Sequence, residues 1–443
     1  MRKVKSLRDV VDWGLCVGCG ACAYYCRHGH VSLVNVLGEG IRPRFKTDHC
    51  ADCVECLEIC PGHRVDGDMV AGEQKKTPGS GQIGVALEIW VGSAADPEIR
   101  RRASSGGLLT ALALYCLERE AMERVVHTAM DEDRPWLNRT VASVDREELM
   151  ARSGSRYAPA SPCDSLGAIE HGERPSVFIG KPCDAAAAMS ARRLRPRLDE
   201  RLGLVLSFFC AGTPATEATL RLLAEMGVRP EMVERLQYRG DGWPGGFAVR
   251  QRGLPSPPPI PYERSWGALS RRRQGRCHLC PDGLGRLADI SCGDAWHRHA
   301  GDGNPGLSLV LVRTERGRRI LHGAMEAGYV RLERVGAREV LAAQANLLGR
   351  RPRIFGRMLG MKLLGIPTPR LEGFGLARDW LRLGPPEQAR TVLGTIRRSI
   401  ARGLWRRRPV PPGAGETPPG VRPRRREMPA ATISGEGSDS CSS

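Results

Sequence analysis

The sequence of 443 residues lacks the long apolar runs of a membrane protein. No stretch reaches the roughly 18 consecutive apolar residues that a membrane-spanning helix needs. The basic start at residues 1–5 is followed by no apolar region of a secretory signal before Trp13. We therefore expect a cytoplasmic, reducing location with no transmembrane segment, in which cysteines stay free of disulfides.

Aromatic residues are also scarce, at 5% of the chain, and they form no run that alternates with basic residues. This scarcity argues against nucleic-acid binding, although a net charge of +18 would be compatible with it. The positive charge is almost entirely arginine, and an acidic redox partner or an anionic substrate explains it as well as nucleic acid does. With 41% hydrophobic and 26% charged residues, the chain can bury the cores of about two or three domains.

What the chain does contain is cysteine, in two copies of the run C-x2-C-x2-C-x3-C. The copies comprise Cys16, Cys19, Cys22 and Cys26, then Cys50, Cys53, Cys56 and Cys60. The two-residue spacing lets three thiolates converge on one cubane, and the fourth cysteine reaches the other cluster in two-cluster ferredoxins. The spacing predicts one 4Fe-4S cluster on Cys16, Cys19, Cys22 and Cys60, and another on Cys50, Cys53, Cys56 and Cys26.

Two other interpretations of these cysteines are weaker. Disulfides need an oxidising compartment, and structural zinc uses fewer cysteines at wider spacing. One departure from the ferredoxin pattern is Arg27 after Cys26, where Cys60 has the usual Pro61. We interpret residues 1–70 as a bacterial-type dicluster ferredoxin module with short strands at 31–36 and near Phe45.

After a linker rich in Gly and Pro at 71–82, strands and helices alternate. The apolar patterns predict strands at 85–91, 125–129, 176–180, 204–209 and 307–312, and helices at 104–118, 182–188, 213–226 and 315–326. This alternation favours an α/β domain at 83–350 with a mainly parallel or mixed sheet, in a chain that is α+β overall.

A helical extension is expected at 351–408, and the Pro-, Gly- and Ser-rich tail at 409–443 should be disordered. From Gly384 a basic helix carries Val392, Ile396, Ile400 and Leu404 on one face. We favour docking of this face on the protein's own surface over a membrane-surface anchor.

A second set of cysteines lies in the α/β domain. Cys183 and Cys210 each follow a predicted strand, and Cys277 and Cys280 form a C-x2-C pair. The carboxyl ends of strands border the ligand crevice of an open α/β sheet. These four thiols could hold a third 4Fe-4S cluster, and a zinc site or isolated buried thiols fit the pattern equally well. Cys116, within an apolar helix, is a small core residue.

Six segments, taken in order, resemble the coenzyme F420 hydrogenase/dehydrogenase beta-subunit family. They are Ser104-Ser-Gly-Gly-Leu-Leu-Thr, Gly154-Ser-Arg-Tyr, Gly180-Lys-Pro-Cys-Asp, Tyr238-Arg-Gly-Asp-Gly-Trp-Pro-Gly, and Cys277-His-Leu-Cys-Pro-Asp followed by Asp289-Ile-Ser-Cys-Gly-Asp-Ala-Trp. The resemblance spans about residues 83–400. It implies FAD and favours the third cluster on Cys183, Cys210, Cys277 and Cys280. Cys292 is then a spare thiol or a substitute ligand.

Candidate flavin contacts follow from the same segments. Ser104, Ser105, Gly106 and Gly107 precede a helix, where glycines, hydroxyls and the helix start can cradle a pyrophosphate. An ordinary serine N-cap explains the string as well, and the resemblance favours the phosphate role. Ser155, Arg156 and Lys181 are candidate flavin or substrate contacts, with solvated loop residues as the alternative.

These cofactors predict an iron–sulfur flavoprotein oxidoreductase that joins one-electron and two-electron chemistry. A redox partner protein would exchange electrons with the clusters, and FAD would exchange hydride with a small molecule such as a deazaflavin or an unsaturated organic compound. Two alternatives stay open: an electron-relay subunit with no substrate of its own, and a zinc-binding module without redox activity. No residue is assigned a catalytic role.

Overall fold

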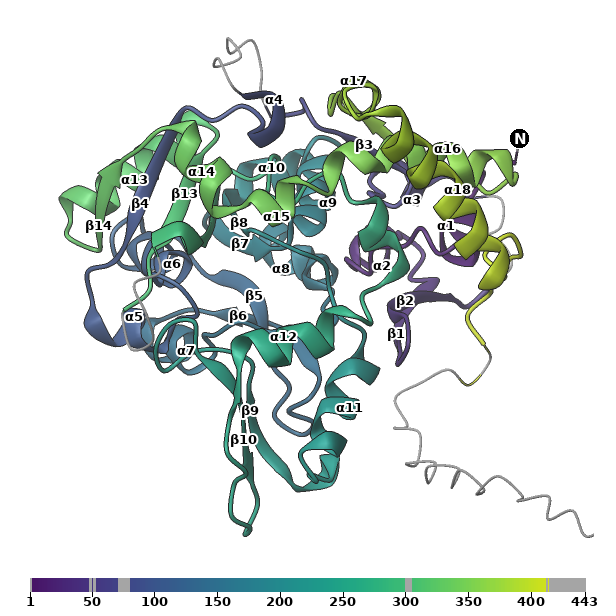
Figure 1. Cartoon of the computed structure of the whole chain (residues 1–443). Coiled ribbons are helices and arrows are strands. Elements are labelled where there is room, and N and C mark those ends of the chain that lie inside the picture. The colour runs from purple at the N-terminus through teal and green to yellow at the C-terminus, as the bar shows by residue number, and fades with distance from the viewer. Residues whose placement is uncertain are drawn as a thin grey trace, which may run out of the picture.

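The computed structural model describes residues 2–47, 50, 53–70, 80–298, 305–411 and 413. It comprises a small N-terminal module, a central α/β domain and C-terminal helices, of which α16, α17 and α18 lie beside the module (Figure 1). The predicted α/β class is confirmed for the central domain. Residues 71–79 of the predicted linker, and nearly all of the predicted tail with Cys441, lie outside the described residues.

The N-terminal module contains three short helices and two paired strands. The helices are α1 (Leu7–Asp12), α2 (Ala21–Tyr25) and α3 (Glu55–Glu58). The two predicted strands are found as β1 (Val31–Val36) and β2 (Gly40–Phe45), and they pair in antiparallel register. A third strand, β3 (Arg64–Asp66), pairs in parallel with β15 (Arg370–Glu372) from the C-terminal part. The module is therefore joined to the rest of the chain through a shared sheet.

The central domain is built on an eight-stranded mixed sheet. Its order is β14 (Val330–Arg334), β4 (Glu88–Ala94), β13 (Ser308–Val312), β12 (Ile290–Asp294), β8 (Leu202–Phe208), β7 (Ser176–Gly180), β5 (Val125–Met130) and β6 (Asn138–Ser143). The four central strands β12, β8, β7 and β5 are mutually parallel. The strands on either side run antiparallel to their neighbours.

Helices cover both faces of this sheet because the central strands are apolar on both faces. On one face, Val177 and Leu204 pack with α6 (Leu108–Glu118) and α13 (Glu315–Glu326). On the other, Phe178 and Val205 pack with α9 (Pro182–Arg192) and α10 (Pro196–Arg201). Adjacent residues of one strand thus pack into different cores. Both must be apolar, which explains why the sequences of these strands are continuous apolar runs.

Most predicted elements are found, and their ends differ. The helix predicted from residue 104 begins at Leu108, since Gly107 adopts a left-handed φ of +78° as its N-cap. The helix predicted at 213–226 is α11 (Thr216–Glu225). Further elements of the domain are α4 (Ser80–Ile83), α5 (Pro97–Arg102), α7 (Arg146–Ala151), η2 (Pro162–Ser165), α8 (Leu166–Glu170), η3 (Pro230–Met232), η4 (Gly275–Leu279) and η5 (Trp296–Arg298).

A separate antiparallel layer projects from the domain at the bottom of Figure 1. It consists of β9 (Val233–Gln237), β10 (Gly246–Gln251), β11 (Ile260–Pro261) and α12 (Tyr262–Ser270). Its core joins Leu222 of α11 with Leu236 and Phe247. The sequence patterns did not predict this layer, because its strands are short and mix charged with apolar residues.

The C-terminal helices are α14 (Ala337–Ala343), α15 (Ala345–Leu348), η6 (Arg351–Arg353), α16 (Ile354–Leu363), α17 (Leu376–Leu381) and α18 (Pro385–Ala401). The basic helix predicted after Gly384 is α18, and it does pack on the protein's own surface. The predicted contact face is wrong, however. Buried residues are Thr391, Thr395 and Ser399, whereas Ile400 is 56% exposed.

The small residues face inward because α16 and α18 approach each other closely. A Cβ on Gly356 would lie 2.1 Å from Thr391 Oγ1, and one on Gly360 would lie 2.7 Å from the carbonyl oxygen of Val392. Such spacing leaves room only for short side chains at the contact. Of the apolar residues that the periodicity placed in the interface, Ile400 therefore lies toward solvent, whereas Val392, Ile396 and Leu404 are half-buried.

Residues after α18 return to the N-terminal module. Arg407 forms ion pairs with Asp9 (2.5 Å) and Asp12 (3.6 Å), and Val410 packs against the core around Leu7. The packed part of the chain thus extends slightly beyond the predicted border at residue 408. Among the described helices, none has the length and apolar character that crossing a bilayer requires.

Candidate functional site

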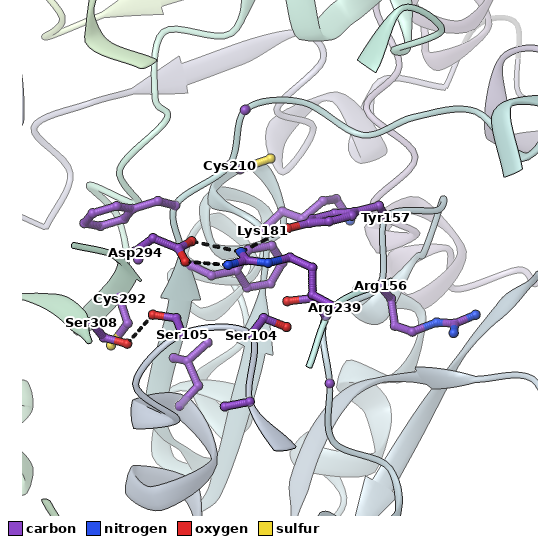
Figure 2. A pocket seen from close by; sticks show the side chains of 18 of the residues that line it. Ser104, Ser105, Arg156, Tyr157, Lys181, Cys210, Arg239, Cys292, Asp294 and Ser308 are labelled. Carbon is purple, nitrogen blue, oxygen red and sulfur yellow. Dashed lines mark hydrogen bonds and ion pairs between the residues drawn. The ribbon is translucent and has the colours of Figure 1, made fainter. Parts of the chain in front are cut away.

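A cavity of about 1070 Å³ opens at the carboxyl ends of the parallel strands (Figure 2). His127 of β5, Ile179 of β7, Phe208 of β8 and Asp294 of β12 all line it. This edge of an open α/β sheet is where such folds bind ligands. The volume suits a dinucleotide-sized cofactor, since cavities for small molecules span roughly 300–1,000 Å³.

Ser104 and Ser105 lie at one end of this cavity, before α6. Ser105 Oγ is 2.6 Å from Ser308 Oγ and donates to the carbonyl oxygen of Leu307 at 3.2 Å. Ser104 is 8% exposed, and no described residue offers its hydroxyl a hydrogen-bond partner. Because buried hydroxyls are normally satisfied, Ser104 Oγ is suited to a ligand at the start of the helix.

The two glycines of this string have different roles. Gly107 provides the left-handed N-cap of α6 and lines the cavity. At Gly106 a Cβ would lie 2.5 Å from the carbonyl oxygen of Gly92 and 2.8 Å from the amide nitrogen of Ser308. Gly106 also donates its N–H to Ser308 Oγ at 2.9 Å. The need for glycine there arises from packing against β4 and β13.

Lys181 follows β7 and points into the same cavity. Its Nζ lies 2.7 Å from Asp184 Oδ2 and donates to the carbonyl oxygen of Ala160 at 3.1 Å. Burial alone would lower the pKa of Lys181, but the charge of Asp184 outweighs it and raises the pKa above its ordinary value. Lys181 is therefore held as a charged ammonium group in the cavity wall, paired with Asp184.

Ser155 and Arg156 line the cavity as well. The Arg156 guanidinium, however, points away from the other labelled side chains in Figure 2. It donates to Asn138 Oδ1 (2.8 Å) and to the carbonyl oxygens of Leu236 (2.7 Å) and Pro135 (2.5 Å). These bonds tie the loop after α7 to the outer layer. The guanidinium therefore acts as a scaffold.

Arg239 and Asp294 form the main polar contact of the opposite wall, and the sequence analysis assigned them no role. The guanidinium donates to both carboxylate oxygens of Asp294, at 2.7 and 3.1 Å, and lies over the ring of Tyr262 at 4.4 Å. Although burial opposes it, Asp294 raises the pKa of Arg239 above its ordinary value. Both residues stand in the quoted family segments, which was the available signal.

Aromatic side chains stack beside this ion pair. Trp296 stacks with Trp243 and with Tyr262, at ring-centroid distances of 5.6 and 5.4 Å. Trp243 Nε1 donates to Asp294 Oδ1 at 2.8 Å, which fixes the stack to the ion pair. Together, the flat aromatic wall and the charged pair form a surface on which a conjugated ring can lie.

His127 titrates abnormally in this cavity. Burial, assisted by the charge of Arg152 and opposed by that of Glu148, lowers the pKa of His127 from 6.5 to about 4. The unfolded chain therefore binds more protons between pH 6.5 and 4, so stability should fall as the pH falls through this window, by about 3 kcal/mol in all. Urea unfolding measured at several pH values should show this fall in the free energy of unfolding, and the fall should be absent in His127→Gln. The control variant His171→Gln, which changes an exposed histidine, should still show the fall. A free energy of unfolding that does not change with pH in the wild type would contradict this prediction.

A second, smaller cavity of about 150 Å³ adjoins the first. Its wall contains Cys183, Cys210, Cys277 and Cys280. Cys210 lines both cavities. Burial, followed by the neighbouring Cys277 and Cys280, raises the pKa of Cys210 to about 12. The four thiols thus surround one space next to the larger cavity, and their ligand role stays a prediction.

The charge around this smaller cavity suits an anionic group. Six arginines line it: Arg273, Arg276, Arg286, Arg350, Arg351 and Arg357. Within the described structure, Nε of Arg273 and of Arg276 is buried without a partner. Burial and the charge of Arg273 together lower the pKa of Arg350. A cluster with four thiolate ligands is negative and would relieve this repulsion.

Backbone amides also point at the cysteine sulfurs. Gly212 N donates to Cys210 Sγ and Thr213 N donates to Cys277 Sγ, each at 3.4 Å. In the N-terminal module, Gly18 N donates to Cys16 Sγ at 3.4 Å. Hydrogen bonds of this kind favour the thiolate that a metal centre needs and tune its potential.

The eight cysteines of the module fall into two groups by their mutual influence. Burial and then Cys19, Cys16 and Cys60 raise the pKa of Cys22. Burial and then Cys26, Cys53 and Cys50 raise the pKa of Cys56 to about 12. Cys60 is thus close to the first three cysteines and Cys26 to the second three, while Cys56 also acts on Cys22; the assignment of the ligands to two clusters stays a prediction.

The two cysteine groups of the N-terminal module differ in how far they lie from the protein surface. Cys53 is exposed, while Pro61, next to Cys60, lines the small cavity in the central domain. No three His, Cys, Asp or Glu side chains of the described ranges lie close enough together to hold a single metal ion. The ligands of a four-iron cluster stand farther apart than those of one ion, because irons and sulfides lie between them.

Cys292 lies on β12, where it is buried and lines the large cavity. Burial raises its pKa to about 12, so its thiol is neutral. Among the described residues around the small cavity, the thiols are those of the four predicted ligands alone. This position favours the spare thiol over the substitute ligand.

Comparison with known proteins gives matches over the central domain. Residues 89–166 match the family model for the N-terminal region of the coenzyme F420 hydrogenase/dehydrogenase beta subunit, and residues 174–337 match the model for its C-terminal region. Coenzyme F420 hydrogenase subunit beta of Methanothermobacter thermautotrophicus is 24% identical over 65% of this chain and 99% of its own. The coenzyme F420-dependent sulfite reductase of Methanocaldococcus jannaschii is 22% identical over 74% of this chain and 49% of its own.

One solved structure shares the fold. It is a chain of the F420-reducing NiFe hydrogenase complex from Methanosarcina barkeri, with a TM-score of 0.50 and 20% identity over 67% of this chain and 99% of that chain. The C-terminal helices from α16 onward and the residues that follow α18 lie outside the matched family segments.

Proposed function

Because this chain belongs to the coenzyme F420 hydrogenase/dehydrogenase beta-subunit family, whose relatives are oxidoreductase subunits, we propose that it is an iron–sulfur flavoprotein. FAD would occupy the large cavity, and three 4Fe-4S clusters would occupy the twelve cysteines grouped above. The observation that carries the proposal is Cys210, whose side chain lines both the large cavity and the small one.

When bound, FAD accepts or donates a hydride or two single electrons, whereas clusters carry one electron at a time. The chain's own residues supply a matching environment. Ser104 and the amides at the start of α6 suit the pyrophosphate. Lys181 supplies a positive charge that favours reduced, anionic flavin. Arg239, Asp294 and their aromatic neighbours form the opposite wall, where a planar hydride carrier could stack.

The solvent exposure of the cysteine groups suggests the order in which electrons would pass between them. The group of Cys53 reaches the surface, the group of Cys60 lies deeper, and the small cavity adjoins the large one. A redox partner protein would therefore dock near Cys53. The hydride carrier is a small molecule, and the deazaflavin coenzyme F420 is the first to test, since relatives bear it in their names.

The deciding experiment is anaerobic purification with iron, acid-labile sulfide and flavin counted per chain. The proposal expects about twelve irons and one FAD. Reduced F420 should then bleach the flavin in a stopped-flow mixing experiment. Zinc without sulfide would support the zinc-binding alternative. Full cofactor content with no hydride exchange would favour the electron-relay subunit.

The serines before α6 permit a sharper test of the flavin cavity. Ser104→Ala should leave folding stability nearly unchanged, because its hydroxyl bonds no described residue, yet should weaken FAD binding at least roughly tenfold. Ser105→Ala should instead cost about 1 kcal/mol of stability, because it breaks the bond to Ser308. Flavin fluorescence titration and urea unfolding measure the two effects. Unchanged affinity in Ser104→Ala would move the pyrophosphate elsewhere in the cavity.

A further inference from the structure

Cys163 is a buried thiol at the contact between the N-terminal module and the central domain. It lies in η2, is 0% exposed, and packs in the same apolar cluster as Cys19 and Ala185. The proposed function gives it no role, since it belongs to neither repeated motif and lines neither cavity among the residues described for them.

The segment around Cys163 holds the first cysteine loop. Cys163 N donates to the carbonyl oxygen of Cys19 at 3.0 Å, and Ser161 Oγ donates to that of Gly18 at 2.7 Å. A Cβ on Gly20 would lie 2.9 Å from Ser161 Cβ. The loop that carries Cys19 is therefore fixed against the central domain at close range.

The Cys163 thiol has two neighbours that can accept a hydrogen bond. Its Sγ is 3.3 Å from the carbonyl oxygen of Asp184, and it packs in the same apolar cluster as Cys19, close enough for the charge of the Cys19 side chain to act on it. A thiol carries a single S–H proton. When Cys19 bears the negative charge of a metal-bound thiolate, its sulfur competes for that proton with the neutral carbonyl.

We propose that Cys163 donates a hydrogen bond to Cys19 Sγ and thereby raises the reduction potential of the cluster on Cys16, Cys19, Cys22 and Cys60. The inference rests on the proposed function, which supplies that cluster. Reduction adds negative charge, and a donor at a ligand sulfur stabilises the reduced form more than the oxidised one. Cys163 is thus a positioning residue in the central domain that acts on a centre in the module.

The test compares potentials in the reconstituted full chain. Cys163→Ala removes the donor and should shift the midpoint potential of one cluster to lower values in an anaerobic titration followed by electron paramagnetic resonance. Cys163→Ser keeps a donor and should restore the potential at least in part. The matched control is Cys116→Ala, another fully buried cysteine, which lies in α6 on the other face of the sheet and should leave every potential unchanged.

Pulsed resonance in heavy water adds a direct measurement. The wild type should show an exchangeable proton coupled to that cluster, and Cys163→Ala should lack it. An unchanged potential and an unchanged proton signal in Cys163→Ala would overturn the inference. So would loss of the cluster in both Cys163 variants but not in Cys116→Ala, because Cys163 would then be a ligand. If Cys19→Ser removes no cluster signal, the proposed function fails instead.

Discussion

Replacing Cys277 with serine should lower the iron content of the anaerobically reconstituted protein from about twelve to about eight atoms per chain, with FAD retained. Cys277 lines the small cavity and accepts the N–H of Thr213 at its sulfur. A serine hydroxyl is a poor ligand for iron, so the third cluster should be lost. FAD should remain, because Cys277 is not among the described residues that line the large cavity.

The matched control is Cys292→Ser, which alters a buried thiol of the large cavity. It should retain about twelve irons. A second measurement concerns electron flow: in Cys277→Ser, flavin reduction by a ferredoxin-type donor should slow strongly, while reduction by dithionite should persist. Twelve irons in Cys277→Ser, or eight in Cys292→Ser, would contradict the assignment of the third site.

The arginines around the small cavity indicate how the third cluster would affect stability. With a cluster present, its negative charge offsets the repulsion between Arg273, Arg350 and their neighbours. Without it, buried guanidiniums such as that of Arg276 keep unsatisfied donors. The cluster is therefore expected to stabilise the contact between the module and the central domain, where Arg276 donates to the carbonyl oxygen of Pro61.

The sequence predicted best what is local in the chain. The strand at 176–180 has the predicted ends, because a short apolar run bounded by breakers leaves little choice. The cysteine spacing predicted which thiols lie near one another. Motif order led to the family, and the segments quoted for it contain Ser104, Lys181, Arg239 and Asp294 of the large cavity.

The sequence failed where packing between distant segments decides. Periodicity favoured Ile400 for the interface of α18, but the glycines of α16 admit only small residues there. Arg156 looked like a ligand contact, yet carbonyl groups more than fifteen residues away occupy its guanidinium. Arg239 and Asp294 are 55 residues apart, so nothing local indicates that they pair.

The ion pair between Arg239 and Asp294 leads to a second prediction with a large expected effect. Arg239→Met should lower the free energy of unfolding by about 3 to 5 kcal/mol, because it leaves the carboxylate of Asp294 largely buried without its cation. It should also weaken FAD or hydride-carrier binding, since the pair orders Trp296 and Tyr262 through direct contact. Urea unfolding and flavin titration measure the two effects.

The control is the ion pair between Arg101 and Asp241, whose side chains are 61% and 56% exposed. Arg101→Met should change stability by no more than about 1 kcal/mol, since solvent screens such pairs. The double variant Arg239→Met, Asp294→Leu should regain part of the stability, because no unpaired charge remains, but should not regain ligand affinity. If the double variant regained ligand affinity, the pair of Arg239 and Asp294 would have only a structural role. An Arg239→Met protein as stable as the Arg101→Met control would contradict the burial argument itself, since the two pairs differ chiefly in their exposure to water.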